Sequence, residues 1–242
     1  MENENWIERA EHIIAGKDSE SLGLDFEALR DEFAHVFWIG GSGCAGKSTV
    51  ANILAEKYDL TTYHTDDRWK DHFQRVETEQ LPLPTITRII ARRNTGEKRE
   101  DQADIAHDKY MAICFAIWQE AFTLELDYLR SLPSNPIIVE GVFIVPWLVA
   151  KIAPQQRVAI LVSYDDFRRE NYMNPNRPEA VLNRFKNSYD PEIAVQNIIA
   201  ANLPMAQTLF KCAKKNALLA MEIDGKDDPD TVAKSVAVHF RL

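Results

Sequence analysis

The stretch FWIGGSGCAGKSTV, residues 37–50, joins an apolar run to a glycine-rich turn that ends in a lysine and two hydroxyls. Residues 41–48 match the pattern G-x-x-x-x-G-K-[ST]. The apolar run predicts a buried strand, and the apolar spacing after the lysine predicts a helix. In that context the glycines let backbone N–H groups approach phosphate oxygens, and the helix start adds positive partial charge. The stretch therefore predicts a loop that holds phosphate groups.

Two residues of this loop have an expected individual role. Lys47 is expected to reach the outer phosphates of a nucleotide, and Ser48 is expected to ligate Mg²⁺. A glycine-rich turn between a strand and a helix, with no ligand at all, is the alternative interpretation. The predicted phosphate-binding residues are Gly41, Ser42, Gly43, Cys44, Ala45, Gly46, Lys47, Ser48 and Thr49.

Length and composition narrow the class of protein. The 242 residues suffice for one sizeable α/β domain, alone or with a small cap. The 28 Lys+Arg against 37 Asp+Glu give a net charge of -9, which disfavours nucleic acid and anionic membranes as partners. No apolar run approaches the roughly 20 residues of a membrane helix. Three scattered cysteines and an acidic N-terminus without an apolar signal segment predict a cytoplasmic protein.

Apolar and β-branched runs alternate with stretches of helical spacing along the chain. This alternation predicts an α/β fold with a mostly parallel, five-stranded sheet covered on both faces. We expect residues 1–34 to form a helical N-terminal extension that packs on a main domain at 35–242. Residues 70–135 exceed what a crossover connection needs and are predicted to be an insertion. The predicted strands lie within residues 35–40, 60–65, 135–145, 157–164 and 217–225.

Acidic residues follow two of the predicted strands. Asp66 and Asp67 come after the second strand, and Glu140 ends the third, directly before a glycine. Because the carboxyl ends of parallel strands share one edge, a carboxylate should lie near the phosphate loop. There it could take a proton from an attacking hydroxyl or hold Mg²⁺. The alternatives are a helix N-cap for the aspartates and a loop hydrogen bond for Glu140. His64 is expected to pack in the strand, since Mg²⁺ prefers oxygen ligands.

The loop and its flanking elements resemble the P-loop NTPase superfamily. Together with four further segments, this loop resembles the nucleoside-kinase and adenylate-kinase-like group of small-molecule kinases, which includes uridine kinase and nicotinamide riboside kinase. The segments are TDDRWK (65–70), IIVEGV (137–142), EIDG (222–225) and VAKSVAVHF (232–240). The resemblance implies a three-layer P-loop fold that uses ATP and Mg²⁺. It also implies transfer of the γ-phosphoryl group to a hydroxyl of a small-molecule acceptor such as a nucleoside or sugar.

The same resemblance implies a site. Asp66 takes the position of the base, with Asp67 as its substitute, and Ser48, Asp66 and Glu140 surround the metal. Residues 70–135 would bind the acceptor. Residues 165–190 would form a mobile lid whose arginines cover the transferred group, because a guanidinium fork pairs with phosphate oxygens. The implied catalytic residues, with Arg177 as a further lid candidate, are Lys47, Asp66, Asp67, Glu140, Arg168 and Arg169.

The arginines of the predicted lid are equally explained as ordinary surface residues.

Two other functional hypotheses stay open at this point. A P-loop ATPase or nucleotide-gated regulatory protein would use residues 1–34 and 70–135 to contact a protein partner. A nucleotide-binding structural protein with an inactive site is the third hypothesis, and intact Lys47, Ser48 and Asp66 disfavour it.

Overall fold

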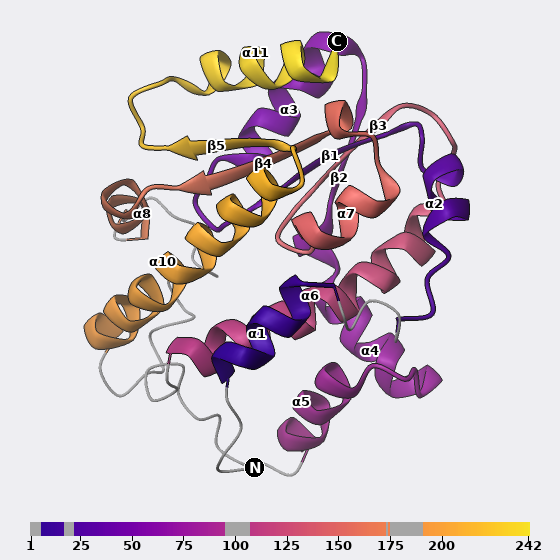
Figure 1. Ribbon diagram of the computed structural model, residues 1–242, viewed down its shortest axis with the longest axis vertical. Coiled ribbons are helices and arrows are strands. Elements are labelled where there is room, and N and C mark those ends of the chain that lie inside the picture. The colour runs from indigo at the N-terminus through magenta and orange to yellow at the C-terminus, as the bar shows by residue number, and fades with distance from the viewer. Residues whose placement is uncertain (1–5, 17–21, 95–106, 173, 175–190) are drawn as a thin grey trace.

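The computed structural model describes residues 6–16, 22–94, 107–172, 174 and 191–242 (Figure 1). Five strands form a single sheet with the order β2-β3-β1-β4-β5, and each neighbouring pair is parallel. The α/β class and the five-stranded sheet are therefore confirmed, and the sheet is parallel throughout. The strands are β1 (Val36–Gly41), β2 (Thr61–His64), β3 (Ile137–Glu140), β4 (Val158–Ser163) and β5 (Leu219–Ile223).

The central strands are apolar because both of their faces are covered. Every residue of β1, β3 and β4 is buried, as expected for a parallel sheet between helices. Successive side chains of β1 point to opposite faces. Trp38 belongs to the larger of two hydrophobic clusters, and Phe37 and Ile39 belong to the smaller one.

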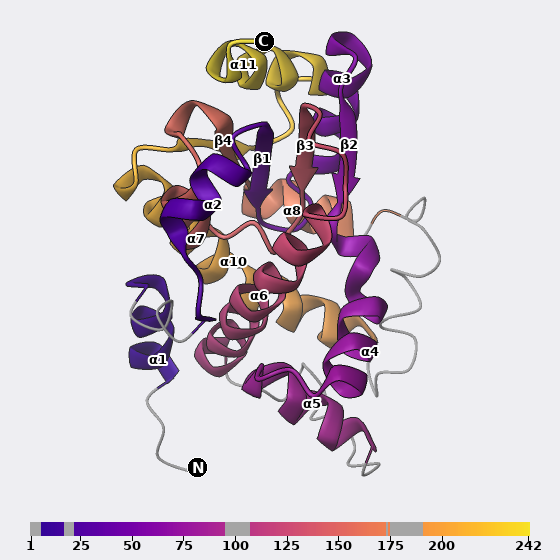
Figure 2. The ribbon, with the colours of Figure 1, turned by 90° about the vertical axis from the view of Figure 1, so that its right-hand side faces the viewer.

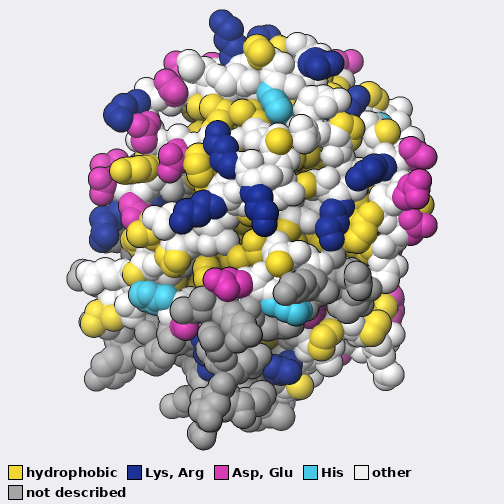
Figure 3. All heavy atoms as spheres, in the orientation of Figure 1, with side chains coloured by type: hydrophobic (Ala, Val, Ile, Leu, Met, Phe, Trp, Pro, Cys, Tyr) yellow, Lys and Arg dark blue, Asp and Glu magenta, His cyan; other side chains and the backbone are white. Residues whose placement is uncertain are grey.

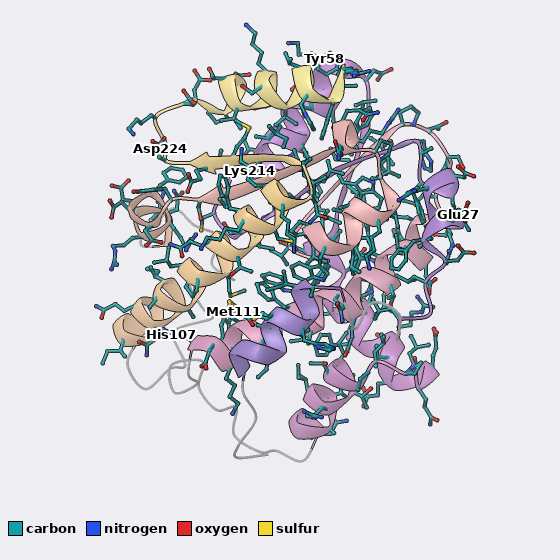
Figure 4. All side chains as sticks on the ribbon, in the orientation of Figure 1. Glu27, Tyr58, His107, Met111, Lys214 and Asp224 are labelled. Atoms are coloured by element: carbon teal, nitrogen blue, oxygen red, sulfur yellow. The ribbon has the colours of Figure 1, made fainter. Side chains whose placement is uncertain are left out.

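Helices cover the sheet on both sides, so the protein has three layers (Figure 1). On one face lie α3 (Lys47–Tyr58) and α11 (Pro229–Phe240), which pack on each other. The other face carries α6 (His107–Leu129), α7 (Pro146–Ile152) and α10 (Pro191–Lys215). Met111, labelled in Figure 4, joins α6 to α10 because the Thr208 hydroxyl donates to its sulfur at 3.9 Å.

The predicted N-terminal extension packs on the main domain. It contains α1 (Trp6–Ile14), which lies against α6, and α2 (Phe26–Glu32), which lies against α7. Apolar residues of this segment belong to the larger hydrophobic cluster. They are Ala10, Ile13, Leu29 and Phe33.

The predicted insertion forms a helical region beside the sheet. It contains α4 (Trp69–Glu79), α5 (Pro84–Asn94) and α6, and α4 and α5 lie on the side of the molecule opposite α11 (Figures 1 and 2). The buried Glu120 carboxylate of α6 accepts hydrogen bonds from Thr85 N and Ile86 N, each at 2.9 Å. A carboxylate at a helix start satisfies N–H groups that have no partner within the helix. Glu120 thereby fixes α5 on α6.

Only part of the predicted lid lies within the described residues. Helix α8 (Asp165–Tyr172) follows β4 directly, and Asn174 is described as well. Residue 173 and residues 175–190, which include Arg177, lie outside the described part of the chain.

The surface is mixed in charge. Figure 3 shows Lys and Arg side chains across the middle of the face on which α10 lies, and α10 contributes the exposed Lys211, Lys214 and Lys215. Within the described ranges, none of the helices has both the length and the apolar character needed to span a membrane.

Candidate functional site

The carboxyl ends of the strands meet at one edge of the sheet, where the arrows of β4 and β5 point in Figure 1. The strand register places Glu140 of β3 between Ile39 of β1 and His64 of β2. Asp224, labelled in Figure 4, follows β5 at the same edge. Parallel pairing thus brings the loop between β1 and α3, the Asp66 turn, Glu140 and the start of α8 to one edge.

The loop between β1 and α3 needs glycine at its first residue. Gly41 has a φ of 129°, and a Cβ there would lie 1.8 Å from the Leu161 carbonyl oxygen of β4. No side chain fits so close to a neighbouring backbone. Ser42 N donates to the same carbonyl at 3.0 Å, so the loop leaves the sheet while still bonded to β4.

Lys47 folds back over the loop. Its side chain is largely buried, and Nζ donates to the Ser42 carbonyl oxygen at 2.8 Å. A buried ammonium needs such a partner because its desolvation is otherwise uncompensated. The positive charge therefore lies inside the turn formed by the glycines, where a phosphate oxygen could replace the carbonyl as its partner.

Ser48, Glu140 and His64 form a hydrogen-bonded group beside the loop. Glu140 is 2% exposed, and its Oε1 accepts from Ser48 Oγ at 2.8 Å and lies 2.6 Å from His64 Nδ1. The second carboxylate oxygen, Oε2, is buried without a hydrogen-bond partner. An unsatisfied buried oxygen costs roughly 1–3 kcal/mol, so Glu140 keeps an acceptor that the rest of the fold does not use.

These oxygens fit Mg²⁺. A hydroxyl and a carboxylate with a spare acceptor are hard donors, and Mg²⁺ bound with a nucleotide takes one or two protein oxygens plus phosphates and water. In the described part of the chain no group of three or more His, Cys, Asp or Glu side chains could hold a metal ion. Ser48 and Glu140 would thus hold the ion together with phosphate oxygens.

Asp66 links the turns that follow β2 and β3. It is exposed, and its Oδ1 accepts from Val142 N at 3.3 Å. Gly141 has a φ of 149°, and a Cβ there would lie 1.8 Å from Thr65 Oγ1, so the two turns press closely together. Neither aspartate occupies a helix N-cap position: His64 precedes the 3₁₀ turn η2 (Thr65–Arg68), and Arg68 precedes α4. The N-cap alternative is therefore wrong.

The two predicted arginines of α8 differ sharply in burial. Arg168 is 0% exposed. Its Nε donates to Ser163 Oγ at 2.8 Å, Nη2 donates to the Ser163 carbonyl at 2.6 Å, and Nη1 contacts Asp165 Oδ1 at 3.4 Å. Arg169 is exposed. In this structure Arg168 is thus buried against the last residue of β4, whereas coverage of a phosphoryl group by either arginine stays a prediction.

Sequence reasoning missed two residues of the site. His64 was expected only to pack in its strand, yet it contacts Glu140. Ser163 was not singled out, yet its Oγ donates to the Gly43 carbonyl at 2.8 Å and its N–H donates to Ser42 Oγ at 2.9 Å. A polar residue that ends an apolar strand was the available signal for Ser163. His64 required the register with Glu140, which no local pattern shows.

A second buried polar group lies between the sheet and the insertion. The fully buried Glu125 of α6 accepts from the Tyr63 hydroxyl at 2.5 Å, and its other oxygen contacts His72 Nε2 of α4. Burial first, and then the Glu125 charge, raise the pKa of Tyr63 well above its ordinary value. This group connects α4 and α6 to β2.

Comparison of the chain with models of known protein families gives no match, and comparison with curated proteins gives none either. The function must therefore be inferred from the geometry of the site.

Proposed function

We propose that this protein transfers the γ-phosphoryl group of Mg²⁺-ATP to a hydroxyl group of a small molecule. The observation that carries the proposal is the 2.8 Å contact between Ser48 Oγ and Glu140 Oε1. It joins the residue after the loop lysine to a buried carboxylate 92 positions away, whose second oxygen has no partner. A turn without a ligand does not require this costly arrangement.

The loop and its lysine would bind the nucleotide. Backbone N–H groups of residues 41–48 and the start of α3 favour the phosphates, and Lys47 exchanges the Ser42 carbonyl for β- and γ-phosphate oxygens. Ser48 and Glu140 would hold Mg²⁺, which neutralises charge on those oxygens when bound. These residues supply positioning and electrostatic stabilisation, the main contributions to phosphoryl transfer.

Asp66 would act on the acceptor. It lies at the end of the strand beside Glu140 and is held by Val142 N, so one carboxylate oxygen is fixed while the side chain stays exposed. The acceptor oxygen forms a bond to the γ-phosphorus as the bond to the β–γ bridging oxygen breaks, and ADP leaves. Asp66 takes the proton of the attacking hydroxyl. Asp67 is its substitute, and Arg169 would cover the transferred group.

The helical region of residues 70–135 would provide the acceptor-binding surface, because α4 begins directly after the aspartates. Nucleosides, sugars and similar metabolites are the acceptor class. The cytoplasm, where Mg²⁺-ATP is abundant, is the location that we propose.

A transfer screen tests the function. Purified protein is mixed with Mg²⁺ and γ-labelled ATP and then with pools of nucleosides, sugars and hydroxy acids, and labelled product and ADP are measured together. Label transfer that depends on a pool supports the proposal, and Lys47→Ala should abolish it. Steady ADP release without any acceptor would favour the ATPase or nucleotide-gated alternative. Unchanged turnover by Lys47→Ala would overturn the assignment of the loop.

A further inference from the structure

An arginine is buried at the base of α8. Arg168 is among the largest side chains of the described residues that are fully buried. A guanidinium loses strong hydration on burial and needs hydrogen-bond acceptors in return. Two of its donors bond to one residue, the Ser163 hydroxyl and the Ser163 carbonyl. The arginine thereby holds the last residue of β4.

Ser163 also forms hydrogen bonds with the loop between β1 and α3. Its hydroxyl donates to the Gly43 carbonyl at 2.8 Å, and its backbone N–H donates to Ser42 Oγ at 2.9 Å. The Ser42 carbonyl in turn accepts from Lys47 Nζ. Hydrogen bonds on both sides of Ser42, joined through the covalent structure of that residue, thus connect Arg168 of α8 with the lysine of the loop.

The chemistry of arginine determines which group donates in each of these hydrogen bonds. A guanidinium only donates hydrogen bonds, whereas a serine hydroxyl both donates and accepts. With Arg168 Nε donating to Ser163 Oγ, the hydroxyl proton is directed to the Gly43 carbonyl. In a planar trans peptide the next N–H points opposite to the carbonyl. Holding the Gly43 carbonyl toward β4 therefore turns the Cys44 N–H away from β4.

We propose that Arg168 is a positioning residue that acts through Ser163 to set the phosphate-binding conformation of the loop. The inference rests on the proposed nucleotide-binding function, and it assigns Arg168 a role different from the lid role expected from the sequence. Without Arg168 the Ser163 hydroxyl can turn to Ser42 Oγ, which lies 3.2 Å away, and the Gly43 carbonyl then keeps only the longer 3.4 Å contact from Ser42 Oγ. The Gly43–Cys44 peptide is then held less firmly. The loop then pays an ordering cost when it binds phosphates.

The test measures affinity for Mg²⁺-ADP by calorimetry, with no acceptor present. Arg168→Gln, Arg168→Lys and Ser163→Ala should each weaken binding by about tenfold or more, the scale of one hydrogen bond to a charged group. Lysine does not rescue, because a single ammonium cannot reproduce the two-pronged donation to the Ser163 hydroxyl and carbonyl. Arg130→Gln is the matched control: Arg130 bonds Glu32 and Asp127 outside the site, and its loss should leave affinity unchanged.

The double variant separates positioning from a purely structural role. If Arg168 acts through Ser163, Arg168→Gln combined with Ser163→Ala loses no more affinity than the worse single variant. If the fold-losses in affinity of the two single variants multiply in the double variant, the proposal is overturned. Wild-type affinity in Ser163→Ala would overturn it as well. If Arg168→Gln does not fold, the Ser163→Ala measurement decides. Absence of Mg²⁺-ADP binding by the unaltered protein would instead reject the proposed function.

Discussion

Replacing Glu140 with glutamine should leave the fold intact and lower phosphoryl transfer by about 100-fold or more. The substitution keeps the size of the side chain and one oxygen acceptor but removes the charge. Glu140 Oε1 serves Ser48 and His64, and Oε2 serves no protein group. A residue retained for stability would not have this unbalanced set of partners.

The expected effect on stability follows from those partners. Charge assistance adds roughly 1 kcal/mol to each of the two hydrogen bonds, and this is lost. The unpaired position then holds a neutral amide NH₂ in place of a charged oxygen, and because an unpaired charged group costs more than the roughly 1–3 kcal/mol of a neutral one, part of that loss is recovered. Hydroxyl and imidazole groups can also reverse their donor and acceptor roles to suit the new amide. The free energy of unfolding should therefore stay within about 1 kcal/mol of the wild-type value, which is a shift of about 2–4 °C in Tm.

Glu120→Gln is the matched control. Glu120 is also a buried carboxylate, but both of its oxygens accept from backbone N–H groups, those of Thr85 and Ile86. Backbone N–H groups only donate, so the new amide NH₂ must face a donor. We expect a loss of about 2–3 kcal/mol in stability and unchanged affinity for Mg²⁺-ADP.

Thermal unfolding and Mg²⁺-dependent phosphoryl transfer, measured on the same preparations, give the comparison. Glu140→Gln should unfold near the wild-type temperature and lose about 100-fold or more in transfer, the upper end of what loss of a metal-supporting group costs. A variant that is destabilised by more than about 3 kcal/mol yet active in its folded fraction would refute this reasoning, because Glu140 would then be a structural residue.

Three further predictions concern neighbouring residues. Asp66→Asn should still bind Mg²⁺-ATP but lose roughly 10²–10⁴ in transfer rate; if only Asp67→Asn shows this loss, Asp67 is the base. His64→Ala should raise the Mg²⁺ concentration required for half-maximal activity about tenfold, with partial rescue by His64→Asn, because Glu140 loses an orienting partner; an unchanged Mg²⁺ dependence would contradict this. Since the pKa of Tyr63 is raised in the folded protein, its contribution to stability is complete below the unfolded pKa near 10 and declines as pH rises above it. Urea unfolding should therefore show a steeper alkaline loss for the wild type than for Tyr63→Phe, and identical slopes would contradict the shift.

Much of the fold could be predicted because its signals are local. Short apolar or β-branched runs are typical of strands in a parallel sheet, and all five predicted strands occur, with ends that differ by a few residues. The loop between β1 and α3 lies where the sequence placed it, since its glycines, lysine and serine are contiguous, and phosphate binding by this loop stays a prediction. The N-terminal segment was predicted to be helical, and its helices α1 and α2 pack on α6 and α7.

Side-chain partners in the site could not be predicted in this way. Arg168 and Arg169 are adjacent and look alike in sequence, yet one is buried against Ser163 and the other is exposed. Their difference depends on how α8 is rotated as it leaves β4, and no local pattern sets that rotation.

The sequence alone determined the class of the sheet and which residues stand at its carboxyl edge, because strand propensity and turn chemistry depend on near neighbours. The tertiary structure alone decided which of those residues touch. The pairing of His64 with Glu140 depends on the register between β2 and β3, and the pairing of Ser163 with the loop depends on β4 lying next to β1. Strand order and register are set by the packing of the whole core, so they appear only when the chain has folded.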